Sequence, residues 1–252
     1  MILITQPRVG TIGTLHSEVL ALHFAAKELG WEVYSTETSW RLPDELIASG
    51  KQGVPYGSQT FCEVIAQQMG WTLHQNSFDW LAKLPIEYTK RKVDFMTLGE
   101  AKLLQETKFI KPADDKVFMA KVYAPGELIV SDVVPNDTPT LVSDVVRWDL
   151  EYRCFVENNR VLTWSNYIFH EHVADPKYWN VIDSNDEALP YEFVQDLLFD
   201  LEDVETVASV IDVGRIPGKG LAIIETNPAW ASGIYGCDPM RMLKVIKSAV
   251  SY

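Results

Sequence analysis

The chain has 252 residues, of which 47% are hydrophobic and 23% charged, and its formal net charge is -13 at pH 7. This composition is typical of an ordinary globular protein in water, with one large domain or two to three small lobes. The acidic charge disfavours nucleic acid, and no apolar run approaches the roughly 20 residues of a membrane span. We therefore expect neither nucleic acid nor a membrane among its partners.

Three cysteines, Cys62, Cys154 and Cys237, are odd in number and far apart in the sequence. Such spacing fits neither a disulfide framework nor a zinc site. The first residues carry no basic region and no small-residue cleavage site, so they are not typical of a signal peptide. We expect reduced thiols in or near the core and a cytoplasmic location.

Residues 1–85 alternate between patterns of strand and helix, which predicts a small parallel sheet with helices beside it. The predicted elements are strands over 1–6 and 31–36 and helices over 15–29 and 58–69. Gly30 and Gly70 end the two helices, and each is followed by a tryptophan that leads into a strand. Ser58 is the expected N-cap of the second helix.

The loop 7–13 follows the first strand and contains two glycines. It lacks the G-x-G-x-x-G pattern and the G-K-[ST] ending of phosphate-binding loops. We therefore interpret it as a turn into the helix, in preference to a phosphate loop.

Near Leu84 the composition changes, and Pro85 with a basic cluster around Arg91 indicates a boundary. Thr97 and Glu100 fit a capping box that begins a short helix. Three strands of a small antiparallel lobe are predicted over 108–112, 117–123 and 127–134. Lys111 stands in the first of them, where its ammonium group needs an anionic partner or must reach outward to water.

The second half of the chain predicts a larger β-rich lobe. Its expected elements are a strand over 141–146, a hairpin of 151–156 with 161–169, a helix over 191–201 and a last helix from Asp238 to about 250. Asn158 and Asn159 form the hairpin turn, and Glu151 and Arg153 share one strand face. His170 with His172 is a weak metal motif, and a polar strand end is the favoured interpretation. Glu202, Asp203 and Glu205 are typical of the solvated end of a helix.

Two strands over 209–214 and 221–228 are joined by a glycine-rich turn and predict an antiparallel hairpin. Glu225 and Asn227 are two residues apart and therefore point to one face, where Asp212 of the partner strand can lie beside them. Two carboxylates and a carboxamide form an oxygen-only ligand set of the kind that Mg²⁺ prefers. The alternative is a strand end and a turn cap, but the whole pattern favours the metal.

Together these landmarks resemble the ATP-grasp superfamily over residues 85–252. In the order typical of that superfamily they are Arg91, Lys111-Pro112, the strand through 144–146, Glu151 with Arg153, and Asp212 with Glu225 and Asn227. The resemblance implies an α/β protein whose two α+β lobes hold ATP between them. We expect an N-terminal α/β domain over 1–85, a small lobe over 86–143 and a C-terminal lobe over 144–252.

The resemblance also implies a role for each landmark. Lys111 and Arg91 would hold the α- and β-phosphates, and Arg153 would contact the γ-phosphate or an acyl phosphate. The remaining nucleotide-binding residues would be Lys116, Asp144, Val145, Val146 and Glu151, with the backbone of 144–146 at adenine. Asp212, Glu225 and Asn227 would bind one or two Mg²⁺ ions, with Mn²⁺ as an alternative ion.

Two segments depart from the family pattern or leave its function open. The segment after Pro112 has no glycine-rich loop, so Lys116 or Lys121 is expected to replace the loop's amides by charge. The loop 230–236 is aromatic and lies close to the expected site. It either helps to receive substrate or packs through Trp230 and Tyr235, and the sequence does not separate these alternatives.

The function implied is that of a divergent ATP- and Mg²⁺-dependent carboxylate–amine ligase that acts through an acyl phosphate. Its partners would be a carboxylate and an amine, each a small molecule or part of a peptide, and the sequence does not indicate an oligomeric state. The alternatives are a phosphotransferase with the same nucleotide site and a non-catalytic protein that responds to nucleotide. Lys111 together with three metal-type residues favours an enzyme.

Overall fold

The N-terminal part of the chain forms a parallel sheet, as its alternating pattern predicts. The computed structural model describes residues 1–6, 14–36, 39–114, 116–131, 133–169, 172–173, 176–179, 181, 189–201 and 206–252. In the sheet, β1 (Ile2–Thr5) lies between β2 (Glu32–Ser35) and β3 (Gly53–Tyr56), and all three strands are parallel. The loop 7–13, which we interpret as a turn, lies outside the described residues.

Strand β3 and the short helix α2 (Asp44–Ala48) were not expected from the sequence. Pro55 and Gly53 disguise β3, since both residues are usually depleted in strands. Gly53 is required here because a Cβ atom would lie 2.2 Å from the carbonyl oxygen of Ile2. The strand is nevertheless buried along its whole length.

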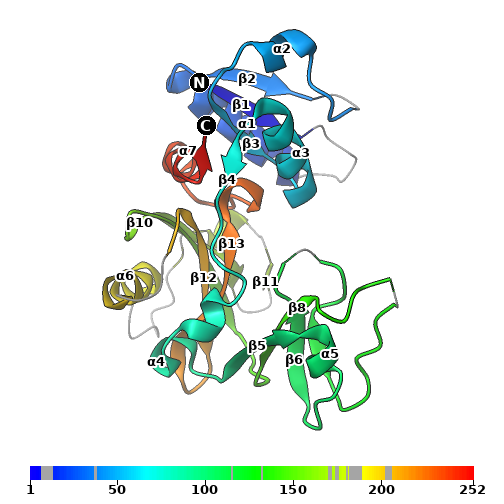
Figure 1. Ribbon diagram of the computed structural model, residues 1–252. Coiled ribbons are helices and arrows are strands. Elements are labelled where there is room, and N and C mark those ends of the chain that lie inside the picture. The colour runs from blue at the N-terminus through cyan, green and yellow to red at the C-terminus, as the bar shows by residue number, and fades with distance from the viewer. Residues whose placement is uncertain are drawn as a thin grey trace.

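Helices α1 (Thr14–Glu28) and α3 (Gln59–Met69) pack on this sheet (Figure 1). Ser58 caps α3 by accepting a hydrogen bond from the backbone N–H of Phe61, and Gly70 ends it in a left-handed conformation with φ of 70°. Both predicted helix signals are confirmed. Cys62 of α3, like Cys154 and Cys237, is a buried free thiol, as expected.

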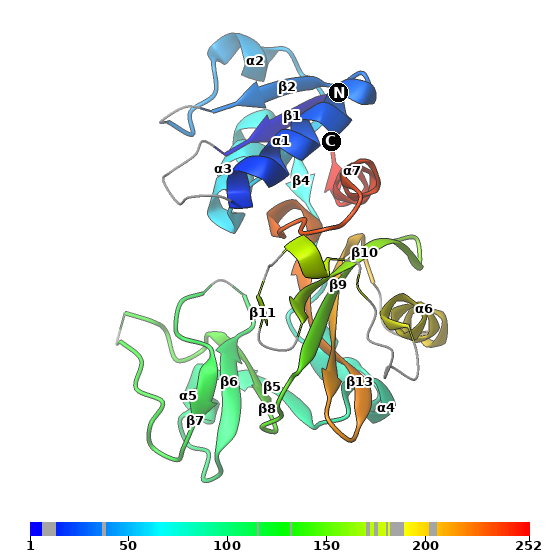
Figure 2. The ribbon, with the colours of Figure 1, turned by 180° about the vertical axis from the view of Figure 1, so that it is seen from behind.

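The C-terminal elements join the N-terminal sheet. Helix α7 (Pro239–Ser248) begins at Asp238, whose side chain accepts from the backbone N–H of Arg241 at 2.9 Å. Its residues Leu243 and Ile246 belong to the same buried core as Leu3 of β1. Strand β14 (Val250–Ser251) then pairs with β4 (Thr72–Leu73), so both ends of the chain lie in one unit (Figures 1 and 2).

The small lobe is an antiparallel sheet in the order β5 (Val93–Thr97), β8 (Pro139–Ser143), β6 (Lys108–Pro112) and β7 (Lys121–Tyr123). Helix α5 (Leu98–Ala101) starts with the predicted capping box of Thr97 and Glu100. The short elements η1 (Trp80–Lys83) and α4 (Ile86–Thr89) lead into this lobe.

The strands expected over 117–123 and 127–134 are largely wrong. Only the three residues of β7 pair with β6, and no described residue of 127–134 belongs to a strand. Ile129 and Val133 are 88% and 86% exposed, so the apolar pattern of this segment does not face a core. Strand β8 also begins two residues earlier than expected and ends at Ser143, three residues before the predicted end.

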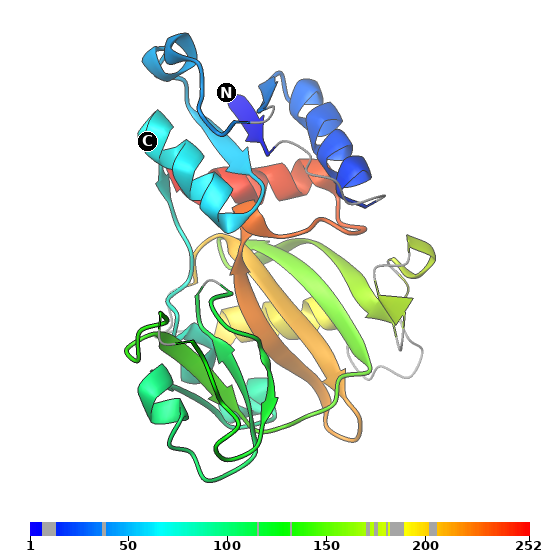
Figure 3. The same cartoon turned by 90° about the vertical axis from the view of Figure 1, so that its right-hand side faces the viewer.

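The large lobe is a five-stranded antiparallel sheet (Figure 3). Its order is β11 (His172–Val173), β10 (Arg160–Phe169), β9 (Leu150–Glu157), β12 (Ser209–Ile216) and β13 (Gly220–Pro228). Asn158 and Asn159 both have positive φ, which confirms the predicted hairpin turn. Helix α6 (Pro190–Asp200) packs Val194, Leu197 and Leu198 into the core of this lobe.

The remaining described elements are η2 (Pro176–Tyr178) and η3 (Ala229–Ala231). His170, Glu202, Asp203 and Glu205, which the sequence analysis considered, lie outside the described residues. Among the helices of the described chain, none combines the length and the hydropathy required of a membrane span.

Candidate active site

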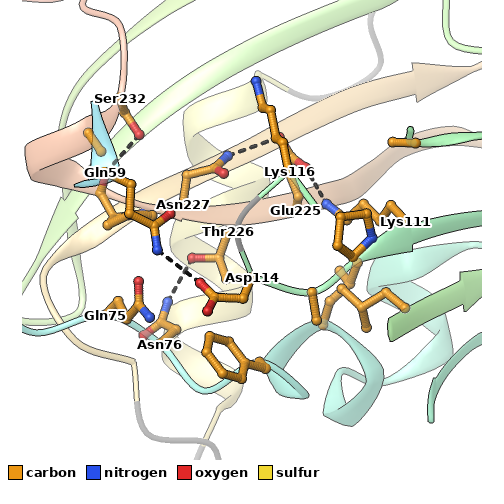
Figure 4. A pocket seen from close by; sticks show the side chains of 18 of the residues that line it. Gln59, Gln75, Asn76, Lys111, Asp114, Lys116, Glu225, Thr226, Asn227 and Ser232 are labelled. Carbon is orange, nitrogen blue, oxygen red and sulfur yellow. Dashed lines mark hydrogen bonds and ion pairs between the residues drawn. The ribbon is translucent and has the colours of Figure 1, made fainter. Parts of the chain in front are cut away.

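Two cavities lie between the lobes and meet at one pair of side chains. The larger has a volume of about 1030 Å³ and reaches from α3 and the N-terminal unit to the strands of the large lobe (Figure 4). The smaller, of about 210 Å³, lies between the small lobe and the start of the large lobe. Lys111 and Glu225 line both cavities.

The polar floor of the larger cavity is a row of residues across the large sheet. Ser165, Arg153, Asp212 and Glu225 are cross-strand neighbours on β10, β9, β12 and β13. Asp212 is directly opposite Glu225, which confirms the juxtaposition predicted from the hairpin. The regular alternation of each strand therefore brings the predicted residues together.

Arg153 and Asp212 form a bidentate ion pair. Nε of Arg153 donates to Oδ1 of Asp212 at 2.9 Å, and Nη2 donates to Oδ2 at 2.8 Å. Asp212 is fully buried. Burial opposes the charge on Arg153, but the neighbouring Asp212 carboxylate outweighs it and raises the pKa of Arg153 above its ordinary value.

Lys111 of β6 donates to Oε2 of Glu225, so this ion pair connects the small lobe with the large one. Burial opposes ionisation of Glu225, but the charge and hydrogen bond of Lys111 outweigh it and lower the pKa of Glu225 to about 2. Figure 4 shows both side chains pointing into the cavity. Of the two alternatives for Lys111, an anionic partner and an outward reach, the structure selects the partner.

Asn227 completes the predicted ligand set. Its Nδ2 lies 3.1 Å from Oδ2 of Asp212 and 2.9 Å from Oε1 of Glu225, so the amide group stands between the two carboxylates. Within the described part of the chain, no group of three or more His, Cys, Asp or Glu side chains has metal-binding geometry. The converging set is thus two carboxylates and one carboxamide, and its oxygen-only chemistry fits a hard cation such as Mg²⁺.

Glu151 lies on the same face of β9 as Arg153, as predicted. A β-bulge in β10 at Tyr167 directs the hydroxyl of that tyrosine to the Glu151 carboxylate. Burial, together with the charges of Asp212 and Glu225, raises the pKa of Glu151 to about 7. This carboxyl group therefore changes its charge near neutral pH.

Arg91 lines the smaller cavity but does not lie in a strand, because β5 begins at Val93. Its guanidinium donates to three backbone carbonyl oxygens, those of Thr89, Ile223 and Ile224, at 2.7 to 3.0 Å. It also lies over the ring of Trp148, with 4.9 Å between Cζ and the ring centroid. Burial lowers the pKa of Arg91 to about 10. Arg91 therefore joins the entry to the small lobe to β13.

Asp144, Val145 and Val146 all line the smaller cavity, as expected. They follow the end of β8 and lead from the small lobe to the large one. Asp144 accepts from Nζ of Lys108 at 2.9 Å and from the backbone N–H of Lys92 at 3.0 Å, which fixes this connection. The remaining wall of the cavity is largely apolar and includes Val93, Phe109, Val122, Leu141 and Trp148.

The two lysines considered as substitutes for a glycine-rich loop lie in different places. Lys116 lines the larger cavity. Lys121 is not among the lining residues of either cavity, and its Nζ lies 4.8 Å from the ring centroid of Tyr123. Lys116 is therefore the better placed of the two to act at this site.

Sequence reasoning missed the residues that the N-terminal unit contributes to the larger cavity. Gln59, at the start of α3, donates to Oδ1 of Asp114 at 2.9 Å, and Gln75 and Asn76 lie on the same side (Figure 4). In the loop 230–236, Trp230 is buried and donates to the carbonyl of His74 at 3.1 Å, whereas Tyr235 lines the cavity. No local sequence signal marks these contacts, because they depend on how distant segments pack.

Comparison with known proteins agrees with this architecture. A family model described as an ATP-grasp domain (clade family 2) matches residues 88–245, more than half of the chain, and the chain therefore belongs to this family. No curated protein matches the sequence.

Solved structures show the same fold. D-cycloserine synthetase DcsG has a TM-score of 0.57 at 11% identity, with 98% of this chain and 99% of that chain covered. N5-carboxyaminoimidazole synthetase from Staphylococcus aureus has a TM-score of 0.55 at 7% identity, with 98% of this chain and 77% of that chain covered. The same synthetase complexed with ADP has a TM-score of 0.51 at 8% identity, with the same coverage. The predicted ATP-grasp fold is thus confirmed.

Proposed function

We propose that this protein is an ATP- and Mg²⁺-dependent ligase that joins a carboxylate to an amine through an acyl phosphate. The observation that carries the proposal is the meeting of two cavities at Lys111 and Glu225. A small, mostly apolar cavity suits a nucleobase, and a large polar one suits phosphates and a second substrate. Membership in an ATP-grasp family and likeness to a synthetase that has been solved with ADP support this assignment.

The nucleotide base occupies the smaller cavity in this proposal. Phe109 and Val122 of the small lobe and Trp148 of the large lobe supply its apolar walls, and the backbone of 144–146 supplies polar contacts. Arg91 holds the wall, because its guanidinium is already bonded to three carbonyl groups and stacked on Trp148. This differs from the phosphate-binding role that the family resemblance implies for Arg91.

The phosphates then extend toward Lys111 and Lys116. Lys111 exchanges its Glu225 partner for phosphate oxygens, which keeps its charge compensated throughout. Asp212, Glu225 and Asn227 would hold one or two Mg²⁺ ions, with Mn²⁺ as an alternative. The metal supplies charge neutralisation for the triphosphate.

Arg153 orients the group that is transferred. Three of its five N–H groups are used, two by Asp212 and one by the carbonyl oxygen of Gly233 at 3.2 Å. Within the described residues, the remaining two N–H groups have no protein acceptor, and Arg153 lines the larger cavity. A planar fork of this kind suits two oxygens of a phosphoryl or carboxylate group.

The reaction proceeds in two steps. A substrate carboxylate oxygen attacks the γ-phosphorus of ATP, the bond to the bridging oxygen breaks, and ADP leaves with that oxygen's electron pair. The amine nitrogen then attacks the acyl carbon, phosphate leaves, and the nitrogen loses a proton to give the amide. Lys111, Lys116 and Arg153 stabilise the charge on the transferring phosphoryl group. The free thiols agree with the cytoplasmic location that we propose.

The test is a screen of carboxylic acids and amines with ATP and Mg²⁺, in which ADP, phosphate and the amide product are measured together. Hydroxylamine in place of the amine should trap the acyl phosphate as a hydroxamate. Glu225→Ala should abolish both signals, and Glu87→Ala, at an exposed position on α4, should not. A stable phosphorylated product would favour a phosphotransferase, and nucleotide binding without ADP formation from any acid would favour a non-catalytic binding protein.

A further inference from the structure

Helix α1 of the N-terminal unit places a buried carboxylate close to the active site. Glu18 is only 9% exposed, and its Oε1 accepts a hydrogen bond from the backbone N–H of Tyr235 at 3.2 Å. Burial raises the pKa of Glu18, while the nearby charge of Arg153 opposes that rise. A carboxyl group buried at this position is unfavourable unless its hydrogen bond has a structural use.

Tyr235 uses its ring to contact Arg153. Its ring stacks on that of Tyr167, with centroids 5.1 Å apart and an angle of 21° between the planes. Cζ of Arg153 lies 5.2 Å from each of the two ring centroids. The guanidinium therefore packs against a pair of aromatic rings, a cation–π arrangement that fixes its plane.

The loop that carries Tyr235 is held from both sides of the molecule. From the N-terminal unit, the hydroxyl of Tyr56 donates to the carbonyl of Ser232 at 3.1 Å. From the large lobe, Nη1 of Arg153 donates to the carbonyl of Gly233 at 3.2 Å. Tyr235 itself has a φ of 48°, a conformation that residues other than glycine rarely adopt and that needs such support.

We infer that Glu18 and Tyr235 are positioning residues that hold the guanidinium of Arg153 against Asp212 with its free N–H groups toward the cavity. The N-terminal unit, through α1, thereby controls the geometry of the phosphoryl-transfer residue in the large lobe. The catalytic consequence rests on the proposed function, whereas the effect on the position of Arg153 does not. A measurement on Arg153 itself can therefore separate the two.

The first experiment follows the Nε–H proton of Arg153 by NMR in the free protein, with its signal assigned by its loss in Arg153→Lys. Hydrogen exchange of this proton should be at least about tenfold faster in Glu18→Ala and in Tyr235→Ala, because the guanidinium opens more often. Tyr235→Phe keeps the stacked ring and should behave like the natural protein. Glu28→Ala changes an exposed carboxylate on the same helix and serves as the matched control. Unchanged exchange in both Glu18→Ala and Tyr235→Ala would overturn the inference.

The second experiment measures ATP binding and turnover in the same variants. Misplaced Arg153 should lower kcat by up to about 100-fold while the KM for ATP changes little, because the base and Lys111 contacts remain. Tyr235→Phe should restore kcat, and Glu18→Gln, which keeps an acceptor oxygen, should restore most of it. Normal kcat in Glu18→Ala and Tyr235→Ala would overturn the catalytic part. If the natural protein forms no ADP with any acid, the proposed function fails, and the exchange data alone decide whether Glu18 and Tyr235 hold Arg153.

Discussion

Lys111 and Glu225 bind one another across the boundary between the two lobes. The lysine lies on β6 of the small lobe, the glutamate lies on β13 of the large lobe, and their side chains separate the two cavities. Each carries a charge that Mg²⁺-bound ATP can replace, since phosphate is an anion for the lysine and the metal is a cation for the glutamate. The free protein thus keeps both charges compensated before nucleotide arrives.

This ion pair leads to a prediction about nucleotide and metal binding. Saturating ATP with Mg²⁺, at about 100 times its Kd, should stabilise the natural protein by about 2.7 kcal/mol. In Glu225→Gln the part of this gain that depends on Mg²⁺ should vanish, and in Lys111→Met the whole gain should vanish. Thermal-shift titrations with ATP, with and without Mg²⁺, measure both effects. An equal Mg²⁺-dependent shift in Glu225→Gln would contradict the metal assignment.

The buried pair of Arg153 and Asp212 predicts a large loss of stability. Asp212→Asn leaves the Arg153 charge buried without its anion, and it should reduce the free energy of unfolding by about 3–5 kcal/mol in urea. The control is Asp149→Asn, which breaks a bidentate pair with Arg215 that is more open to water and should cost less. Equal losses in the two variants would show that burial of the first pair has no special weight.

Glu151 predicts a pH dependence near neutrality. Its pKa is about 7 in the folded protein and 4.5 as the ordinary value, so the folded state holds the proton more tightly. Between these two values the unfolded chain has lost the proton that the folded chain retains. The stability of the natural protein relative to Glu151→Gln should therefore fall as the pH rises from about 4.5 to about 7, and then stay constant.

Urea unfolding at a series of pH values measures this difference. The same profile for Glu87→Gln, at an exposed position, should show no such fall near neutral pH. A flat difference between the natural protein and Glu151→Gln would mean that Glu151 is ionised throughout this range. Because Glu151 interacts with Asp212 and Glu225, the apparent pKa belongs to the group of carboxylates together.

Gly214 predicts a link between backbone packing and the smaller cavity. A Cβ atom at this position would lie 2.7 Å from Cε3 of Trp148 and 2.9 Å from the carbonyl oxygen of Leu150. Gly214→Ala should therefore displace Trp148, reduce stability by about 1–3 kcal/mol and weaken ATP binding. Isothermal titration with ATP checks the second effect, and Gly99→Ala, whose nearest neighbour would be 3.3 Å away, is the milder control. Unchanged ATP affinity would exclude Trp148 from the nucleotide site.

Local rules explain why part of the candidate site could be predicted from the sequence. Strand alternation places Glu225 and Asn227 on one face, and a short turn places Asp212 opposite Glu225. These relations need only neighbouring residues, and the structure confirms them. The catalytic and binding roles assigned to the same residues stay predictions, because they concern ligands.

Other features depend on packing between distant segments, and the sequence does not encode them locally. Glu18 and Tyr235 are 217 positions apart, and neither has a neighbour that marks the contact. The carbonyl groups that bind Arg91 belong to β13 and are invisible in a basic cluster. The apolar residues of 127–134 are typical of a strand, but a strand also needs a partner, and this segment has none among the described residues.

The packing of α7 has a consequence for the order in which the chain can mature during synthesis. Residues of β1, made first, share their core with Leu243 and Ile246, made almost last. The N-terminal unit therefore stays incomplete while the ribosome produces both lobes of the grasp, and it closes only after α7 has emerged. The oldest part of the nascent chain is then the last to reach its native core, and a ribosome stalled before α7 would display an exposed apolar surface to chaperones.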